Sequence, residues 1–307
     1  MYNLRSSRRT MELSTVFCPI CQSEVVKVGS KRGDRFGAVF HVFECKSCLY
    51  RYVSNPSTDY NKIYDEDYYA GKGSDPMIDY SSEYFSPNDT VRRHDWEGIE
   101  IVVDKLRPGG GRWLDYGCGN GSLVRAVSSG GNRPHKKRWE ILGFDVGSWT
   151  ERARADGLPI LTEDSLARMV GTFDVITAIE VIEHVHNPVD FLRKLRTYLK
   201  PGGLLFITTL NAEVSPGNFL DWGYLKPEIH ISFFTPKSLS LAMDKSGFRP
   251  IYPGFISGWE KIIRFKVLKN LGVRRHHKIH SLIPWSLVSR LVDLKFRVTR
   301  LPVGVAS

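Results

Sequence analysis

The central part of the chain alternates short apolar runs with amphipathic segments. Short runs rich in Val, Ile, Leu and Phe are typical of buried strands, whereas apolar residues that recur every three or four positions are typical of helices. Buried strands are predicted for residues 112–115, 140–146, 158–161, 173–179 and 203–210. Helices are predicted between them for residues 122–127, 149–155, 165–170 and 188–199. Because strands that alternate with helices form parallel sheets covered on both faces, this order predicts an α/β fold.

Further segments flank this alternating region. The spacing of apolar residues over 89–106 predicts a helix, which ends at the Pro-Gly-Gly-Gly run that follows it. A second helical pattern covers 236–246, and 250–256 is typical of another strand. Residues 130–138 (GGNRPHKKR) are polar throughout, which predicts a loop inserted between the first helix and the second strand of the alternating region.

Four of the five cysteines form two Cys-x-x-Cys pairs near the start of the chain. The pairs are Cys18 with Cys21 and Cys45 with Cys48. Two such pairs at this separation can place four thiolates tetrahedrally around one zinc ion. Since four thiolates leave no open position for water, we expect a structural zinc site. Iron in the same site, an empty site and a redox dithiol are the alternatives that this pattern leaves open.

Length and charge narrow the class of protein. With 307 residues the chain is long enough for one large core and a small module. The net charge of +10 is uneven, because residues 259–307 hold eleven Lys and Arg against two acidic residues. The rest is close to neutral, which disfavours a surface built for nucleic acid. Neither a membrane-spanning run nor a secretory signal is found, so we expect a cytoplasmic protein whose residues 1–16 are a disordered leader.

A glycine-rich turn follows the first strand of the alternating region, in residues 114–121 (LDYGCGNG). Glycines there let the backbone approach a ligand closely, and the following helix offers free N–H groups. Asp115, two residues before the first glycine, favours a ligand with a cationic end. Asp145 ends the next strand, where a carboxylate can accept both hydroxyls of a ribose, and Asp164 follows the third strand, where an acid can meet an adenine amino group. Together these residues predict S-adenosylmethionine as the ligand.

The sequence resembles the class I S-adenosylmethionine-dependent methyltransferases. The matching stretches are LDYGCGNG, GFD, FDVI and LKPGGL, at residues 114–121, 143–145, 173–176 and 199–204. The resemblance implies a Rossmann-like, seven-stranded, mostly parallel sheet with helices on both faces. It also implies that the glycine loop and the acid ending the second strand bind the cofactor. The implied cofactor-binding residues are Asp115, Gly117, Cys118, Gly119, Asp145, Asp164 and Glu180. The side chain of Cys118 is expected to pack within the loop and not to act as a nucleophile.

A narrower resemblance concerns residues 177–203 (TAIEVIEHVHNPVDFLRKLRTYLKPGG), which look like the ubiquinone-biosynthesis O-methyltransferases and their bacterial relatives. The cysteine-bearing start of the chain, with Asn55-Pro56 and the Tyr- and Asp-rich residues 64–69 behind it, resembles the zinc-ribbon leader of many such relatives. The resemblance covers residues 17–257. It implies O-methylation of a small-molecule, sugar or lipid-linked acceptor.

Groups that could take the proton of an acceptor hydroxyl follow the fourth strand. Glu183 and His184 lie three and four residues after Glu180, so all three share one side if the segment turns helically. The hypotheses for them are a general base at His184, a Mg²⁺ site, and local hydrogen bonding without a catalytic role. His230, before the next helix, is the second candidate base. Nearby aromatic residues predict a lid or an acceptor wall; they are Phe219, Trp222, Tyr224, Phe233 and Phe234.

The basic tail repeats apolar residues at helical spacing. They are Trp285, Leu287, Val288, Leu291, Val292, Leu294 and Phe296, flanked by Arg290, Lys295, Arg297 and Arg300. Three arrangements are open to such a helix. It can dock on its own domain, lie on an anionic membrane surface or contact the phosphates of RNA. Docking is favoured here and nucleic acid is the least favoured, which leaves peripheral contact with the inner face of the membrane as the alternative.

These observations predict five parts: a leader (1–16), a zinc ribbon (17–54), a connecting segment (55–88), a methyltransferase domain (89–257) and a basic amphipathic extension (258–307). The predicted function is S-adenosylmethionine-dependent methyl transfer. One alternative is an RNA base methyltransferase that grips RNA with its ribbon and tail. The other is a non-catalytic subunit or scaffold that binds the cofactor.

Overall fold

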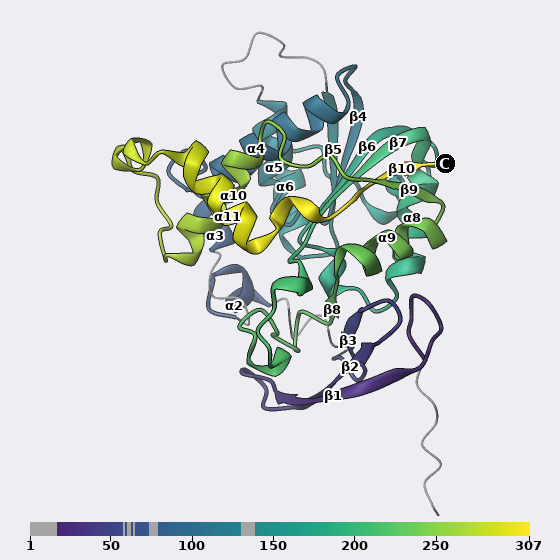
Figure 1. Ribbon diagram of the computed structural model, residues 1–307. Helices are drawn as coiled ribbons and strands as arrows, with labels where there is room; N and C mark the ends of the chain where they lie inside the picture. Colours follow the sequence, from purple (N-terminus) through teal and green to yellow (C-terminus); the bar gives the residue numbers. More distant parts are fainter. Residues whose placement is uncertain (1–16, 58, 60–62, 64, 74–78, 130–138) are drawn as a thin grey trace, which may run out of the picture.

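The computed structural model describes residues 17–57, 59, 63, 65–73, 79–129 and 139–307 (Figure 1). The predicted leader (1–16) and the predicted polar loop (130–138) lie outside the described residues.

A six-stranded sheet forms the centre of the molecule (Figure 1). Its strand order is β5 (Trp139–Phe144), β4 (Gly111–Tyr116), β6 (Phe173–Ile179), β7 (Leu199–Thr208), β10 (Val303–Ala306) and β9 (Phe248–Ile251). The pairs among β5, β4, β6 and β7 are parallel, and β10 is antiparallel to both of its neighbours. Five strands therefore share one direction, which confirms the predicted Rossmann-like α/β fold with a mostly parallel sheet.

The sheet has six strands among the described residues, not the expected seven, because the predicted strand 158–161 is reduced to a bridge between Gly143 and Ile160. Two backbone hydrogen bonds hold it: the amide of Gly143 donates to Pro159, and the amide of Leu161 donates to Gly143. Pro159 has no N–H to extend the ladder. The preceding helix ends only a few residues before this segment and the next helix begins directly after it, so there is no room for a longer strand.

Helices cover both faces of the sheet (Figure 1). On one face, Trp113 and Phe206 pack with α4 (Arg93–Leu106), α5 (Ser122–Ser128) and α10 (Trp259–Asn270). On the other face, Leu114 and Leu205 pack with α8 (Pro188–Tyr198) and α9 (Pro236–Lys245). Helix α6 (Trp149–Ala155) adds Ala153 to the first of these faces, α7 (Glu163–Ala167) adds Leu166 to the second, and α11 (Trp285–Phe296) packs on α10. Since neighbouring residues of a strand point to opposite faces, burial on both faces explains why these strands are apolar at almost every position.

The end of the chain belongs to the sheet and corrects the expectation of an extension that only docks on the domain. Residues 303–306 form β10, which lies between β7 and β9. Gly304 fits beside the Phe248 ring, where an added Cβ would come within 2.9 Å of the ring. The segment VGVA is too short to stand out by its periodicity, so the sequence does not predict this strand.

The cysteine-bearing module forms a second sheet of four antiparallel strands (Figure 1). Its order is β1 (Val25–Arg32), β2 (Val39–Cys45), β3 (Arg51–Val53) and β8 (Ser232–Phe233). The first three strands come from the predicted ribbon, whereas β8 comes from the segment between β7 and α9 of the large domain. Between the two sheets, the predicted connecting segment contributes α2 (Glu66–Tyr69) and α3 (Tyr80–Phe85).

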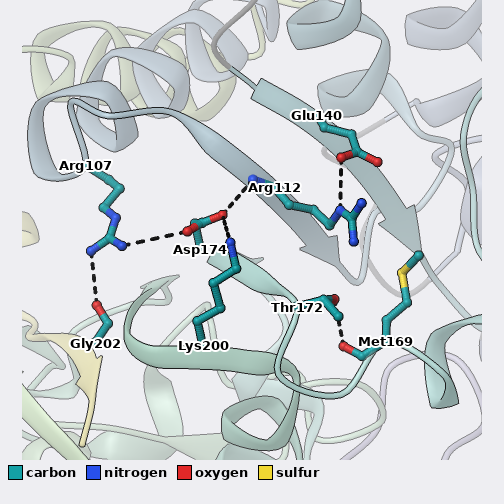
Figure 2. A network of polar contacts seen from close by, with 8 residues as sticks. All are labelled: Arg107, Arg112, Glu140, Met169, Thr172, Asp174, Lys200 and Gly202. Atoms are coloured by element: carbon teal, nitrogen blue, oxygen red, sulfur yellow. Dashed lines mark hydrogen bonds and ion pairs between the residues drawn. The ribbon is translucent and has the colours of Figure 1, made fainter.

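An ion-pair network ties together the amino-terminal ends of the central strands (Figure 2). The Asp174 carboxylate at the start of β6 accepts from the amide of Arg112 at 2.9 Å and from the Lys200 Nζ at 2.7 Å. The Arg107 guanidinium lies 3.8 Å from its other oxygen. Burial opposes ionisation of Asp174, but Lys200 and the Arg112 amide more than offset this and lower its pKa.

Replacing Asp174 by alanine is expected to lower the free energy of unfolding by about 1–3 kcal/mol, because the Arg112 amide loses its acceptor beside two cations. Since the folded pKa of Asp174 is depressed, its contribution is present above the unfolded pKa of about 3.9 and is lost as the pH falls through the folded pKa. Urea unfolding at pH 7 and pH 3 measures both effects. A difference between wild type and variant that is the same at both pH values would contradict the ionic role.

Candidate cofactor pocket and catalytic cluster

A cavity of about 490 Å³ opens at the carboxyl ends of β4, β5 and β6. Its lining joins the glycine loop after β4, the turn after β5, the segment after β6 and one side of α10. In open α/β sheets this edge is where ligands bind, because the loops that leave parallel strands converge there.

The glycine loop has the backbone that the sequence predicts. Gly117 and Gly119 have φ angles of 81° and 55°, in the left-handed region that favours glycine. An added Cβ on Gly117 would collide with the Val181 side chain. The amides of Gly117 and Cys118 both donate to the carbonyl of Phe144, at 2.7 and 3.1 Å. This turn brings the loop against the end of β5 and makes Gly117, Cys118 and Gly119 part of the cavity wall.

The two predicted carboxylates Asp115 and Asp145 line this same cavity. Asp115 is 4% exposed and accepts from the Thr177 hydroxyl at 2.8 Å. Burial raises the pKa of Asp115 to about 7, against the opposing effect of that hydrogen bond. Asp145 accepts from the amide of Gly119 at 2.8 Å and from the amide of Gly147 at 2.7 Å. The two acids therefore face a shared space, one shielded from water and one fixed by backbone amides.

Asp164 is the predicted cofactor residue that the structure does not bring to the cavity. It lies exposed in the first turn of α7, whose start is capped by the Thr162 side chain. The other six predicted residues, which include Glu180, all contribute to the lining.

Arg92 is a cavity residue that the sequence analysis missed. Its guanidinium is buried, with Nη1 3.7 Å from the Glu83 carboxylate and Nε 4.0 Å from Asp95. Burial raises the pKa of Glu83 to about 7 and also raises that of Asp95. Tyr69 of α2 joins them in the lining, so the tyrosine- and acid-rich connecting segment closes one side of the cavity. The abundance of tyrosine and acidic residues in this segment was the sequence signal that could have indicated its place at the cavity.

Glu180 stands at the end of β6 with a φ of 54°, an uncommon backbone for a residue other than glycine. Its Oε1 accepts from the Lys266 Nζ at 2.8 Å and from the Thr208 hydroxyl at 3.0 Å. Burial would raise its pKa, but Lys266 outweighs burial and the pKa of Glu180 falls to about 2. Glu180 is therefore a fixed anion, held by a lysine from α10 that the sequence analysis did not single out.

Glu183 is fully buried, in the short 3₁₀ turn Ile182–His184. Burial, followed by repulsion from Glu180, raises its pKa to about 8. The Tyr224 hydroxyl donates to Oε1 of Glu183 at 2.6 Å. Two acids three residues apart thus have opposite states at neutral pH: Glu180 is ionised and Glu183 is mostly protonated.

The histidines His184 and His230 face each other beside Glu183, with ring centroids 5.1 Å apart. Nδ1 of His184 lies 2.8 Å from the carbonyl of Ile229, and Nδ1 of His230 lies 2.8 Å from the carbonyl of Tyr224. A carbonyl only accepts, so each Nδ1 carries a proton. One ligand atom each from Glu183, His184 and His230 lies within 4.8 Å of the others. The predicted cluster of Glu183 and His184 therefore also contains His230, which comes from the loop before α9.

The four cysteines of the N-terminal module converge as predicted. Cys18 and Cys48 have sulfurs 3.6 Å apart, those of Cys21 and Cys45 are 3.3 Å apart, and all four lie within 4.8 Å of one another. Each pair is followed by a left-handed residue, Gln22 with φ 63° and Leu49 with φ 64°. Tetrahedral zinc with bonds of about 2.3 Å separates sulfurs by roughly this distance. The sulfur geometry therefore fits a four-thiolate zinc site.

Comparison with known proteins adds the family. Residues 94–252, more than half of the chain, match the family described as a methyltransferase domain. The chain belongs to this methyltransferase family. Membership confirms the predicted domain type, together with its Rossmann-like fold.

Curated relatives of this methyltransferase include ubiquinone biosynthesis O-methyltransferases. That of Burkholderia lata is 38% identical over 139 residues, covering 43% of this chain and 60% of the relative. That of Xanthomonas axonopodis pv. citri is 32% identical over 123 residues, covering 37% of this chain and 48% of the relative. The chain spans about half the length of the curated relatives it matches.

Solved structures similar to this methyltransferase include the putative methyltransferase in a complex with the Haloferax volcanii Trm112 methyltransferase activator. That chain has a TM-score of 0.47 and 18% identity, with 70% of this chain and 92% of that one covered. A SAM-dependent methyltransferase from Aquifex aeolicus has a TM-score of 0.40 and 19% identity, with coverages of 55% and 89%.

Proposed function

We propose that this methyltransferase transfers the methyl group of S-adenosylmethionine to a hydroxyl oxygen of a small-molecule, sugar or lipid-linked acceptor. The observation that carries the proposal is the placement of Asp115 and Asp145 on one cavity, across a glycine loop, in a chain of the methyltransferase family. Calorimetric titration with S-adenosylmethionine tests it. Absence of heat at ligand concentrations in the millimolar range would contradict it.

The cavity offers a complementary group for each end of that cofactor. Asp145 retains acceptor capacity for the ribose hydroxyls, because a carboxylate can accept about four hydrogen bonds and two are used. The buried carboxyl of Asp115 becomes ionised beside the cationic amino group of the methionine part. The guanidinium of Arg92 can pair with that part's carboxylate. The cofactor itself supplies an electrophilic methyl group on a sulfonium centre.

The acceptor then lies toward Glu183, His184 and His230, beyond the methionine end of the cofactor. We propose that Nε2 of His184 or His230 takes the hydroxyl proton as the oxygen attacks the methyl carbon, since each Nδ1–H is fixed by a carbonyl. The base is not assigned to Glu183, because burial and repulsion from Glu180 raise its pKa. Lys266 and Glu180 hold this side of the cavity together.

The same three residues bear on the predicted Mg²⁺ site. Two imidazoles and one carboxylate are donors that suit transition-metal ions such as zinc, whereas Mg²⁺ prefers oxygen ligands. The donor set therefore does not fit Mg²⁺. In the N-terminal module, by contrast, the cysteines would hold Zn²⁺ and cross-link two turns of backbone.

A contact with an anionic membrane surface is the further partner that we propose; together with the proposed cytoplasmic location, it would place the protein at the inner face of the membrane. The tail docks on its own domain: Trp285 and Ser289 of α11 are buried against α10, where the Arg264 guanidinium lies 5.0 Å from the Trp285 ring centroid. Docking uses only one side of α11. Leu287, Leu291 and Leu294 stay 57%, 58% and 73% exposed.

These three leucines recur at helical spacing, so they form a stripe on one face. Ile279 and Leu282, in the segment before α11, add exposed apolar surface. Cationic residues accompany these positions in the sequence, namely Arg274, Arg275, Lys278, Arg290 and Lys295. Apolar side chains rimmed by cations match a bilayer with anionic headgroups. Among the described residues no helix has both the length and the apolarity needed to span a bilayer, so this contact is a surface one.

Sedimentation with vesicles tests the contact. The protein is expected to bind phosphatidylcholine vesicles that contain 30% phosphatidylglycerol more tightly than vesicles without it, by about 1 kcal/mol for each engaged cation. The triple variant Leu287→Ser, Leu291→Ser and Leu294→Ser should lose most of its binding to both vesicle types, because it lacks the exposed apolar stripe, whereas Lys46→Ala on the ribbon should bind as wild type does. Equal binding to both vesicle types would contradict the proposal, as would salt-sensitive binding to RNA that the triple variant retains.

A further inference from the structure

The segment that carries Tyr224 and His230 is built into the cysteine-bearing module. Residues 209–235 connect β7 to α9, and β8 within them pairs with β3 of the ribbon: Ser232 opposes Tyr52 and Phe233 opposes Arg51. The amide of Val53 also donates to the carbonyl of Ile231 at 2.9 Å. The ribbon sheet is therefore complete only with a strand from the candidate catalytic region.

A buried carboxylate reinforces this junction two residues before His230. Glu228 is 4% exposed, and its carboxylate accepts from the amides of Arg35 and Phe36 at 3.0 and 2.8 Å. These amides belong to the turn between β1 and β2. An added Cβ on Gly33 would collide with the Glu228 side chain, so the turn and the carboxylate fit closely. The turn of the ribbon hairpin is thus hydrogen-bonded to residues 209–235 at a point close to His230.

Three further ribbon residues hold the same segment. The Lys31 ammonium donates to the carbonyls of Leu220 and Trp222 at 3.0 and 3.4 Å. The Arg51 guanidinium donates to the Ser215 hydroxyl at 3.1 Å, and the Tyr50 hydroxyl lies 2.5 Å from that of Ser232. Behind these contacts a shared apolar cluster joins Phe40, Val42 and Val53 of the ribbon to Phe219, Leu225, Ile231 and Phe233 of the segment.

The segment in turn orients both candidate bases through its backbone. The carbonyl of Ile229 fixes Nδ1 of His184, and the carbonyl of Tyr224 fixes Nδ1 of His230. The amide of Ile231 donates to the carbonyl of Glu183 at 2.8 Å. None of the described ribbon residues lines the cavity. The hydrogen bonds that link the described ribbon residues to the two histidines therefore run through residues 209–235, and an apolar cluster that the cysteines share with Ile182 adds a second connection.

We infer that the four-cysteine ribbon is a positioning module for the acceptor half of the site. A metal held by the four cysteines would fix β1–β3, these strands hold residues 209–235, and that segment sets the orientation of the His184 and His230 rings. This inference rests on the proposed function. The acids of the cofactor half, Asp115 and Asp145, take their hydrogen bonds from outside the ribbon, from Thr177, Gly119 and Gly147. On that side the ribbon contributes the ion pair of Arg35 with Asp65, which caps the start of α2. Glu228 is the positioning residue at the junction.

The test compares Glu228→Ala with Glu228→Gln and with Lys46→Ala in the full chain. Lys46 is an exposed ribbon residue that pairs with Glu44, so its loss leaves the junction intact. Glu228→Ala is expected to reduce kcat about 100-fold, the order of effect that a small misplacement of catalytic groups produces. Its dissociation constant for S-adenosylmethionine should stay within about twofold of wild type. Glu228→Gln, which keeps one acceptor oxygen, should recover part of the loss, and Lys46→Ala should match wild type.

Hydrogen exchange gives a second measurement that needs neither acceptor nor activity. In Glu228→Ala, and in wild type stripped of metal, residues 209–235 should lose protection while residues 111–121 keep theirs. Unchanged protection of 209–235 in both samples would overturn the inference. A parallel fall of cofactor affinity and kcat in Glu228→Ala would also overturn it. If native protein fails to bind S-adenosylmethionine, the proposed function fails, yet the exchange result still decides whether the ribbon orders the segment.

Discussion

Replacing Asp145 by alanine is expected to remove most of the affinity for S-adenosylmethionine. The carboxylate is proposed to accept two ribose hydroxyls, and hydrogen bonds to a charged group contribute about 1.5–3 kcal/mol each. The dissociation constant should therefore rise by about 100-fold or more. The loss of an acceptor for the Gly119 and Gly147 amides adds to the effect, because both belong to the cavity wall. Calorimetric titration at pH 8 measures the change.

Asp164→Ala is the matched control. It removes an acid that was also predicted to contact the cofactor, but this acid is exposed and lies outside the cavity lining. Its affinity should stay within about twofold of wild type, since surface substitutions of this kind have small effects. The reverse ranking of the two variants would mean that the adenosine part lies elsewhere, over α7, and the proposed cofactor orientation would fail.

The double variant His184→Asn and His230→Asn is expected to reduce kcat by about 10²–10⁴-fold, the usual contribution of general-base catalysis. Affinity for S-adenosylmethionine should change little, since both side chains lie beyond the proposed methionine end. His186→Asn is the control, because His186 is an exposed neighbour in the same loop. Single-turnover methyl transfer with labelled cofactor measures the rate. A double variant with the kcat of wild type would contradict the assignment of the base to either histidine.

The variant Glu183→Gln tests whether Glu183 is a metal ligand in this cluster. Because the pKa of Glu183 is raised to about 8, its carboxyl is mostly protonated at neutral pH and glutamine imitates that state. The variant should keep kcat within a few-fold at pH 7. A large loss, together with inhibition of wild type by a chelator that leaves the cysteine site loaded, would instead identify Glu183 as a metal ligand.

Much of the central fold could be predicted from the sequence because its signals are local. The strand Phe173–Ile179 and the helix Trp149–Ala155 have the bounds that their apolar patterns indicate. The glycine loop also was predictable, since positive φ angles at Gly117 and Gly119 require that residue type. The failures involve short segments. Residues 158–161 lie between two helix ends and form one bridge, and β10 has four residues whose role depends on neighbours more than fifty positions away.

The candidate site was predictable in parts for a similar reason. Asp115 lies near the carboxyl end of β4 and Asp145 directly follows β5, so parallel topology alone brings them to one edge. Glu183 and His184 are sequence neighbours, but their approach to His230 depends on how the loop before α9 folds onto the ribbon. Arg92 directly precedes α4 and Lys266 belongs to α10, both outside the alternating region, and no local pattern marks a cation that will be buried beside an acid. Glu228 gave no signal, because a surface loop and a buried junction have the same composition.

The position of β10 affects when the central sheet can be completed during synthesis on the ribosome. Strand β9 borders only β10 in the central sheet, and β10 ends at Ala306. While the intervening helices emerge, β7 and β9 therefore keep exposed edges that can pair with other polypeptides. The parallel half of the sheet, from β4 to β7, can assemble during translation, but β9 can join it only after residues 303–306 have emerged from the exit tunnel.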